Sequence, residues 1–179
     1  GYFKQPEKTA EAFIENGWFA TGDVGRFCKD GTVKITGRVK ALAKNCLGEY
    51  IAMEALESTY VLNNICLPNG VCILVDQQQP FICALALTDE AKAMAFAAEK
   101  KIPGTWPEIL DTPAFRKAGI ASMVETAKGE KKLRQEWVKN VRFLNEEWTP
   151  ENGVMTAAMK LRRKPVEEKY DAVIKEMFS

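Results

Sequence analysis

Alternating apolar and polar positions near the start of the chain predict a β-hairpin. Two short extended runs, Val24 to Cys28 and Thr32 to Arg38, flank the tripeptide Lys29-Asp30-Gly31. An Asp-Gly pair between alternating apolar positions favours a tight turn, because glycine adopts positive φ at little cost. The first segment with recognisable chemistry is therefore expected on a hairpin.

Past the hairpin, the apolar positions take helical spacing and then form two dense runs. Met53, Leu56 and Tyr60 fall at i, i+3 and i+7, which predicts one face of a helix. Val71 to Val75 and Pro80 to Leu87 have the pattern of two buried strands joined by a turn of three glutamines.

The second half of the chain contains residues that are typical of the ends of several more helices and strands. Hydroxyl side chains, prolines and glycines stand where helices are expected to begin and end. The predictions are a helix capped by Thr88 with the stripe Ala91, Met94, Ala95 and Ala98, a helix from Thr112-Pro113 to Gly129, a short basic helix around Leu133 and Trp137, a strand from Val141 to Leu144, a turn from Pro150 to Gly153, and a final helix opened by Pro165 with Val166, Tyr170, Val173 and Met177 on one face. Strands and helices mix without strict alternation, so the predicted class is α+β.

Composition narrows the possible chemistry. The chain has 179 residues, 46% of them hydrophobic, which is enough for a sizeable core. The formal net charge of +1 gives no electrostatic case for nucleic acid or an anionic membrane surface. Histidine is absent, which excludes Ser-His-Asp and Cys-His catalysis and zinc sites that need imidazole. Proton or charge chemistry must therefore use carboxylates, lysine, arginine or tyrosine.

The cysteines and the chain ends bear on the compartment. The five cysteines are odd in number and form no CxxC pair, which indicates reduced, mostly buried thiols in an intracellular protein; they are Cys28, Cys46, Cys66, Cys72 and Cys83. No apolar run has the length of a signal peptide or a membrane span, and no segment indicates a particular compartment. The chain opens at Gly1 in mid-pattern, so we expect it to be a piece of a longer protein.

A carboxylate and a guanidinium mark the two ends of the predicted hairpin. Asp23 directly follows Thr21-Gly22, where glycine lets the backbone approach a ligand and the carboxylate can accept from two neighbouring hydroxyls, as in a ribose diol. Arg38 can bond hydroxyls or phosphate oxygens in a bidentate manner. On spacing alone, a solvated turn aspartate and a surface arginine paired with a nearby acid are open alternatives.

Three lysines are further candidates. Lys40 and Lys44 precede Gly48, and two lysines at this spacing are also typical of a solvated face. Lys160 lies among small and apolar residues after a Pro-Glu-Asn-Gly turn, where it can deliver positive charge to a developing negative charge on phosphate or carboxylate. The alternative is a basic stretch before an amphipathic helix that docks on an acidic surface.

Taken in order, these segments resemble a known family. Gly-Trp-Phe-x-Thr-Gly-Asp, an Asp-Gly hairpin, Ile-x-Gly-Arg-x-Lys, Lys-x-x-x-Gly-Glu-Tyr-Ile, Trp-Thr-Pro-Glu-Asn-Gly and Ala-Ala-Met-Lys-Leu-Arg-Arg follow one another. The series resembles the C-terminal third of long-chain fatty acyl-CoA synthetases, of the adenylate-forming superfamily that includes luciferases and peptide synthetase adenylation domains. The resemblance covers essentially the whole chain.

The resemblance implies a fold and a reaction. Residues 1–39 would be the tail end of the large ATP-binding N-terminal domain, ending in the hairpin. Residues 40–179 would be a small mobile C-terminal domain, a lid with a short central sheet flanked by helices. The full enzyme would activate a fatty acid with Mg-ATP to an acyl-adenylate and then transfer the acyl group to coenzyme A.

By match of motif, the resemblance also implies a role for each candidate. Asp23 and Arg38 would bind the ATP ribose, and Lys40 would be the hinge. Lys160 would be the catalytic lysine of adenylation. Lys44 would lie on the face used in the thioester step, and Gly48 would lie near the path of the pantetheine arm. ATP, Mg²⁺ and coenzyme A would be the substrates and metal of the full enzyme, and no metal site is expected in this chain.

Parts of the family pattern are missing, which leaves alternatives open. The phosphate loop, the adenine pocket and the fatty-acid tunnel lie upstream in the family, and no GxxxxGK[ST] loop occurs here. The chain alone is therefore expected to be inactive, with the N-terminal domain of the same polypeptide as its partner and membrane association possible only through missing parts. The first alternative is a non-catalytic interaction or regulatory module that keeps the lid fold. A nucleic-acid module built on Lys128 to Arg134 and Lys160 to Lys164 is disfavoured, because acids lie within or beside both clusters.

Overall fold

A computed structural model describes all residues, 1–179. The chain divides into two compact units, Gly1–Leu42 and Ala43–Ser179, here called unit 1 and unit 2. Each unit is described by itself. The domain boundary expected between residues 39 and 40 lies just before this division.

Unit 1 contains the predicted hairpin. Its elements are helix α1 (Pro6–Ala12) and the antiparallel strands β1 (Asp23–Phe27) and β2 (Val33–Arg38). Gly31 has φ +85° in the turn, and the Asp30 carboxylate accepts hydrogen bonds from the Thr32 N–H (3.0 Å) and hydroxyl (2.7 Å). These bonds hold the pKa of Asp30 below its usual value. The hairpin prediction is confirmed.

The hairpin also contains a β-bulge that the sequence pattern does not announce. Val24 pairs with Gly37 and Gly25 with Ile35, so Thr36 is the extra residue. The Thr36 hydroxyl donates to the Val24 carbonyl (3.1 Å), which ties the bulge to the facing strand. A bulge bends its strand and re-aims the side chains at the strand end.

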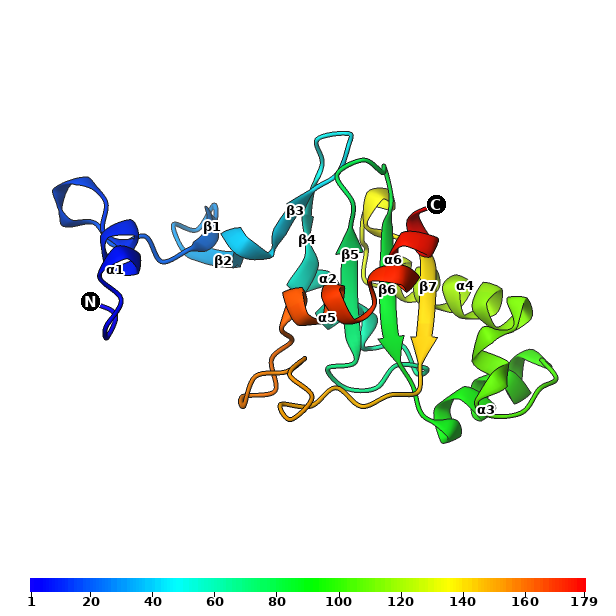
Figure 1. Cartoon of the computed structure of the whole chain (residues 1–179). Coiled ribbons are helices and arrows are strands. Elements are labelled where there is room, and N and C mark those ends of the chain that lie inside the picture. Colours follow the sequence, from blue (N-terminus) through cyan, green and yellow to red (C-terminus); the bar gives the residue numbers. More distant parts are fainter. The chain divides into compact units, whose positions relative to one another are not determined.

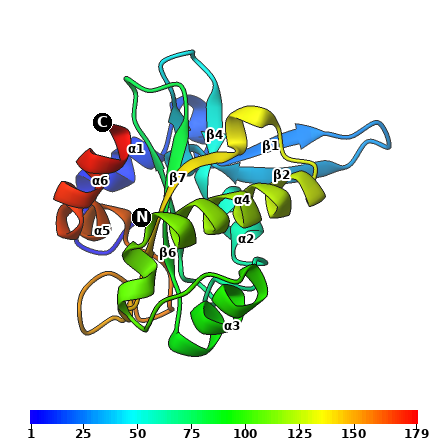
Figure 2. The same cartoon turned by 90° about the vertical axis from the view of Figure 1, so that its right-hand side faces the viewer.

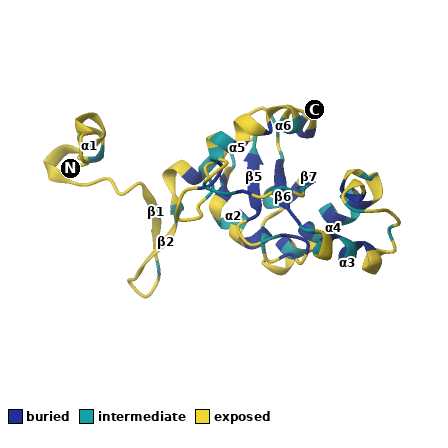
Figure 3. Cartoon of the chain, turned by 60° about the horizontal axis from the view of Figure 1, so that its bottom comes forward, coloured by how far each residue is buried: buried dark blue, intermediate teal, exposed yellow.

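Unit 1 buries almost nothing. Ala41 is its only buried residue, and Figure 3 shows both hairpin strands as exposed. Large apolar side chains lie open to solvent, among them Phe3, Trp18, Phe27, Val33 and Ile35. The order in this unit therefore comes from turns and ladder hydrogen bonds rather than from a core.

A three-stranded sheet forms the centre of unit 2. Its strands are β5 (Val71–Val75), β6 (Ile82–Leu87) and β7 (Val138–Leu144), in the order β5-β6-β7. β5 and β6 are antiparallel, whereas β6 and β7 are parallel. Two shorter strands, β3 (Leu42–Lys44) and β4 (Tyr50–Ala52), pair separately.

Helices cover both faces of this sheet (Figures 1 and 2). Alternate β6 residues point to opposite sides, so that Ile82 and Ala84 join one core while Cys83 and Leu85 join the other. The first core is completed by α2 (Met53–Tyr60), α3 (Glu90–Lys100) and α4 (Pro113–Gly129), and the second by α5 (Arg163–Lys169) and α6 (Asp171–Phe178). The α+β class is confirmed, and the fold is a small central sheet flanked by helices.

Most of the predicted elements of unit 2 are present. Met53, Leu56 and Tyr60 are all buried on α2, and the two predicted central strands are β5 and β6. Thr112 caps α4 by accepting from the Phe115 N–H (3.3 Å), and α4 ends at Gly129 as predicted. The third strand begins at Val138 rather than Val141, and the short basic helix is a single 3-10 turn, Arg134–Glu136.

The prediction for α3 is wrong in its cap and in its face. Asp89, not Thr88, is the N-cap, since its carboxylate accepts from the Lys92 N–H (2.8 Å). Thr88 is buried, and its N–H donates to the Leu144 carbonyl. The buried face is Ala93, Phe96 and Ala97; of the predicted stripe, Ala91, Ala95 and Ala98 are exposed, and only Met94 packs against the core, half-buried. Phe96 offers more apolar area than any alanine of the helix, so its side turns inward.

The predicted final helix is divided in two. It begins at Arg163 rather than Pro165 and breaks at Tyr170 into α5 and α6. Tyr170 is buried, and its hydroxyl accepts from Trp148 Nε1 (3.0 Å) and donates to the Glu146 carboxylate (3.1 Å). This fixed tyrosine explains the break, because the chain turns around a side chain that the core already holds.

Candidate functional site

The hairpin brings Asp23 and Arg38 together. They are opposite each other in the ladder, with Arg38 Nε 3.3 Å from Asp23 Oδ1. Gly22, at φ +76°, makes the turn before Asp23, and Thr21 Oγ1 accepts from the Asp23 N–H (3.1 Å). The two side chains stay 30% and 66% exposed, so both can also reach a ligand. Arg38 is thus paired with Asp23, the other candidate residue of the hairpin.

Lys40 lies in a short 3-10 turn, Val39–Ala41, directly after β2. Its side chain is exposed, and the division between the two units follows two residues later, after Leu42. The structure therefore places Lys40 in a short connection rather than inside a helix or strand of either unit.

Lys44 and Gly48 share one loop of unit 2. Lys44 ends β3, with its ammonium 5.7 Å from the centre of the Tyr50 ring. Gly48 has φ +82°, and a Cβ atom added there would lie 3.5 Å from Lys44 Cε. That distance is an ordinary contact, so it is the positive φ that favours glycine at this position.

The residue that shapes this loop, Asn45, is not one that the sequence analysis identifies. Asn45 is buried, and its Oδ1 accepts from the N–H groups of Leu47 and Glu49, both at 3.0 Å. Its Nδ2 donates to the Glu49 carboxylate (2.7 Å), and its backbone carbonyl accepts from Gly48 N–H (3.1 Å). An asparagine three residues before a glycine is a signal for such a turn.

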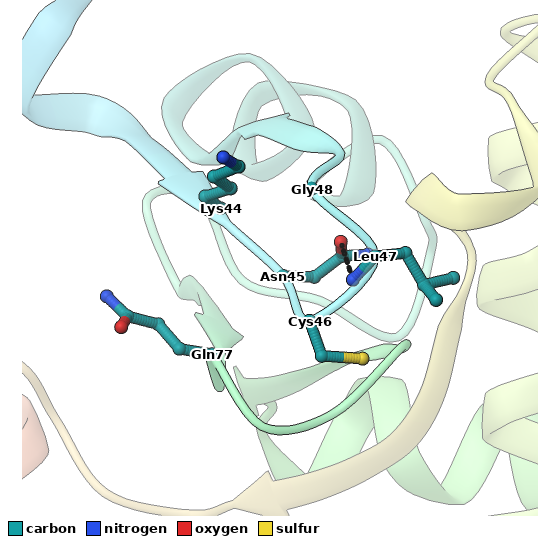
Figure 4. Close-up of a pocket in the computed structure, with 6 residues that line it drawn as sticks. All are labelled: Lys44, Asn45, Cys46, Leu47, Gly48 and Gln77. Atoms are coloured by element: carbon teal, nitrogen blue, oxygen red, sulfur yellow. Dashed lines mark hydrogen bonds between the residues drawn. The ribbon is translucent and has the colours of Figure 1, made fainter.

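An open hollow of about 470 Å³ lies along the loop (Figure 4). Its lining is polar and small, and is contributed by Lys44, Asn45, Cys46, Leu47, Gly48 and Gln77. Gln77 comes from the β5–β6 turn, and Cys46 N–H donates to Gln79 of the same turn (3.3 Å). The hollow is open to solvent.

Lys160 lies on a different, tight loop of unit 2. Met155 and Leu161 form an antiparallel bridge, and within it the Thr156 N–H donates to the Lys160 carbonyl (2.8 Å). The Lys160 N–H donates back to the Thr156 hydroxyl (3.1 Å), and Met159 takes a left-handed conformation at φ +56°. The backbone of Lys160 is therefore fixed even though the loop carries no helix or strand.

The Lys160 side chain, in contrast, is free. It is exposed and takes part in none of the ion pairs of the chain. A lysine on a fixed backbone with no internal partner is suited to meet a charge supplied by a ligand. The alternative is a basic stretch that docks on an acidic surface, and two other members of that stretch do pair with acids, Arg163 with Glu57 and Lys164 with Glu168.

Two further properties bear on the possible cofactors. No group of three or more His, Cys, Asp or Glu side chains is arranged to hold a metal ion. All five cysteines are free, and burial raises the pKa of the Cys66, Cys72 and Cys83 thiols to about 12.

None of the helices is both long and apolar enough to span a bilayer.

Comparison with known proteins finds long-chain-fatty-acid–CoA ligases that are similar to this chain. This chain is 34% identical over 168 residues to long-chain-fatty-acid–CoA ligase 3 of Saccharomyces cerevisiae. The alignment covers 92% of this chain and 24% of that ligase. Ligase 1 of Cavia porcellus is 31% identical over 179 residues, 100% of the chain and 25% of its own length. The chain is a relative of the long-chain-fatty-acid–CoA ligases. It spans about a quarter of the length of these relatives, and no protein-family profile matches it.

Solved structures share the fold of this chain. The A-PCP didomain of a carboxylic acid reductase from Segniliparus rugosus, in complex with AMP, matches with a TM-score of 0.83 and 24% identity, over 100% of this chain and 23% of its own. The adenylation domain of a carboxylate reductase from Mycobacterium chelonae gives the same score over 99% of the chain. The chain therefore shares its α+β fold with part of these adenylation-domain structures.

Proposed function

We propose that the protein to which this chain belongs is an AMP-forming long-chain fatty acid–CoA ligase. Residues 1–39 would end its ATP-binding domain, and residues 40–179 would form a mobile lid domain that turns about Lys40. The carboxylate of a fatty acid would attack the α-phosphate of ATP, releasing pyrophosphate and forming an acyl-adenylate. The coenzyme A thiol would then displace AMP and give the thioester.

The observation that carries this proposal is the presentation of Lys160. Its ammonium is unpaired and its backbone is fixed at both ends of a tight loop. In the first step, negative charge shifts from the attacking carboxylate to the phosphate, and a preorganised positive charge between them lowers the barrier. The carboxylate is already ionised at neutral pH, so the step needs no general base and agrees with the absence of histidine.

The other candidates fit the remaining tasks of this reaction. Asp23 and Arg38 are adjacent and accessible, as needed to bind the hydroxyls of the ATP ribose. Lys44 and Gly48 border an open hollow that suits the extended pantetheine arm of coenzyme A in the second step. Mg²⁺ would arrive with the ATP phosphates.

The compartment and partners follow from the same picture. Five free cysteines, three of them buried, support an intracellular, reducing location. The N-terminal domain of the same polypeptide would be the main partner, and fatty acid, ATP and coenzyme A the small-molecule substrates. The isolated chain would be inactive, because it holds neither a phosphate loop nor a fatty-acid tunnel.

An assay of the complete protein tests the proposal. Palmitate, Mg-ATP and coenzyme A should together yield AMP, pyrophosphate and palmitoyl-CoA in equal amounts, and omission of the fatty acid should abolish pyrophosphate release. The isolated 179-residue chain is the negative control. A complete protein that binds these substrates but forms no AMP would instead support the non-catalytic interaction module.

A further inference from the structure

An ion pair joins helix α2 to the residue that follows the Lys160 loop. Arg163, the first residue of α5, donates from Nη2 to Glu57 Oε1 of α2 at 2.5 Å. The two residues are 106 positions apart in the sequence, and their side chains are only 23% and 14% exposed. Figure 1 shows the start of α5 beside β5 and α2.

The pair also binds the free edge of the central sheet. β5 is an edge strand, and the Ile73 N–H donates to the same Glu57 Oε1 (2.9 Å). The Ile73 carbonyl accepts from Arg163 Nη1 (2.5 Å). Glu57 and Arg163 thus satisfy both backbone groups of Ile73, as a neighbouring strand would, and they hold the start of α5 against the sheet.

Arg163 directly follows the two residues that close the Lys160 loop. Leu161 bridges Met155, and Arg162 donates from its N–H to the Val154 carbonyl (2.8 Å) and from Nη1 to the Gly153 carbonyl (2.8 Å). Val154 and Met155 are buried on the other side of the loop. A shift of Arg163 would therefore move the strand of the loop that carries Lys160, while the opposite strand would stay in the core.

Stability alone does not account for this pair. Burial raises the pKa of Glu57, and the Arg163 guanidinium only partly offsets that cost. Partly buried ion pairs often contribute little net stability, because desolvation cancels most of the attraction. What the pair supplies is fixed geometry, since hydrogen bonds to Glu57 and to the Ile73 carbonyl hold the guanidinium in one position.

We propose that Glu57 and Arg163 are positioning residues for Lys160, and that their ion pair sets the place of the Lys160 loop during acyl-adenylate formation. The inference rests on the proposed function for its catalytic consequence, but the anchoring of the loop stands on the contacts alone. Positioning matters because displacement of a catalytic group by about 1 Å can lower a rate about 100-fold.

The first test measures the loop itself in the 179-residue chain. Arg163→Lys keeps the charge but cannot bond Glu57 and the Ile73 carbonyl together. Hydrogen exchange of the Thr156 and Arg162 amides should become about 10-fold faster, while the β6 amides of Ala84 and Leu85 should not change. The matched control is Arg142→Lys, which disturbs an equally shielded arginine that bonds Asp111 and Glu176. Unchanged exchange of Thr156 and Arg162 in Arg163→Lys would overturn the inference.

The second test measures the two half-reactions in the complete enzyme. Arg163→Lys should lower fatty-acid-dependent pyrophosphate exchange about 10- to 100-fold, while thioester formation from supplied acyl-adenylate changes less than 3-fold. Glu57→Gln, which retains the shape of the site, should give a smaller loss of the same kind. Equal loss of both half-reactions would overturn the inference and indicate a purely structural pair.

The failures of the inference and of the proposed function are distinguishable. If Lys160→Ala abolishes exchange but Arg163→Lys does not slow it, the positioning role is wrong and the function stands. If Lys160→Ala leaves exchange unchanged, the catalytic role of Lys160 is wrong, whatever Arg163→Lys does to the Thr156 amide.

Discussion

The two units hold their candidate residues by different means. In unit 1, Asp23 and Arg38 meet because a turn and one ladder pair place them opposite each other, and almost no side chain there is buried. In unit 2, the Lys160 loop is followed by Arg163, which bonds Glu57 of α2, 106 positions away in the sequence. Local geometry is enough to bring Asp23 and Arg38 together, whereas we infer that the place of Lys160 depends on a contact between distant parts of the chain.

The difference between the two units in how stability depends on pH should be greatest at alkaline pH. Burial raises the pKa of the Cys66, Cys72 and Cys83 thiols from 9.0 to about 12, and of Tyr60 from 10.0 to about 12. Above pH 9 the unfolded chain loses protons that the folded chain keeps, so stability falls as pH rises. The loss is up to about 1.4 kcal/mol per pH unit for each group. Unit 1 contains none of these four residues.

Circular dichroism between pH 8 and pH 12, with urea titration at each pH, measures this loss. The free energy of unfolding should be level below pH 9 and fall steeply above it. Cys66→Ala lowers stability at every pH but should also make that fall less steep, because one titrating group is gone. An unchanged slope in Cys66→Ala would show that the buried thiols do not govern the alkaline limit.

Replacing a phenylalanine by alanine should lower the free energy of unfolding far more in unit 2 than in unit 1. Phe115 is fully buried, and its ring meets those of Phe96 and Phe143 edge-on, both at 5.5 Å. Phe115→Ala should lower the free energy of unfolding by about 3–5 kcal/mol. Phe27 is 86% exposed, so Phe27→Ala should change it by less than about 0.5 kcal/mol in the isolated chain. Urea denaturation compares the two, and similar losses would contradict the account of unit 1.

How much of this could be read from the sequence also differs between the units. The hairpin and its turn follow from local patterns. The bulge at Thr36 escapes them, and it is this bulge that shifts the register so that Asp23 faces Arg38. In unit 2 the pattern predicts the strands and most helices. It does not reveal the buried face of α3 or the break at Tyr170, because both depend on which side chains the core accepts.

The site shows the same limit. The Lys160 loop was predicted as a candidate from its residues, but the Glu57 and Arg163 contact joins positions 106 residues apart, and no local pattern marks it. Asn45 is intermediate, since an asparagine before a glycine predicts a turn but not which amides it will bind.

A hinge at Lys40 would couple the two units during the reaction. Lys40→Pro fixes φ near −65° and removes a backbone donor. In the complete enzyme it should slow one half-reaction at least about 10-fold and spare the other, whereas Lys40→Ala should spare both. Pyrophosphate exchange and thioester formation, measured separately, provide the comparison, and equal losses in Lys40→Pro would count against a hinge here.

The smallest effect on stability is expected at the exposed pair of unit 1. Asp23→Asn should change the free energy of unfolding by less than about 1 kcal/mol, because the ion pair is open to solvent. It should nevertheless raise the KM for ATP about 10-fold in the complete enzyme, since a charge-assisted bond to the ribose is lost. Asp30→Asn, in the same hairpin, is the matched control. An equal rise of KM in both variants would remove Asp23 from the ribose site.

The most direct test of the account is the effect of Lys160→Ala on the two half-reactions of the complete enzyme. Fatty-acid-dependent pyrophosphate exchange should fall about 100- to 1,000-fold, because a preorganised charge is removed from the first step. Thioester formation from preformed acyl-adenylate, in a single turnover, should be retained. Lys164→Ala, which removes a more exposed lysine with only a 4.0 Å contact to Glu168, should leave both rates unchanged. An undiminished exchange rate in Lys160→Ala would contradict the central claim.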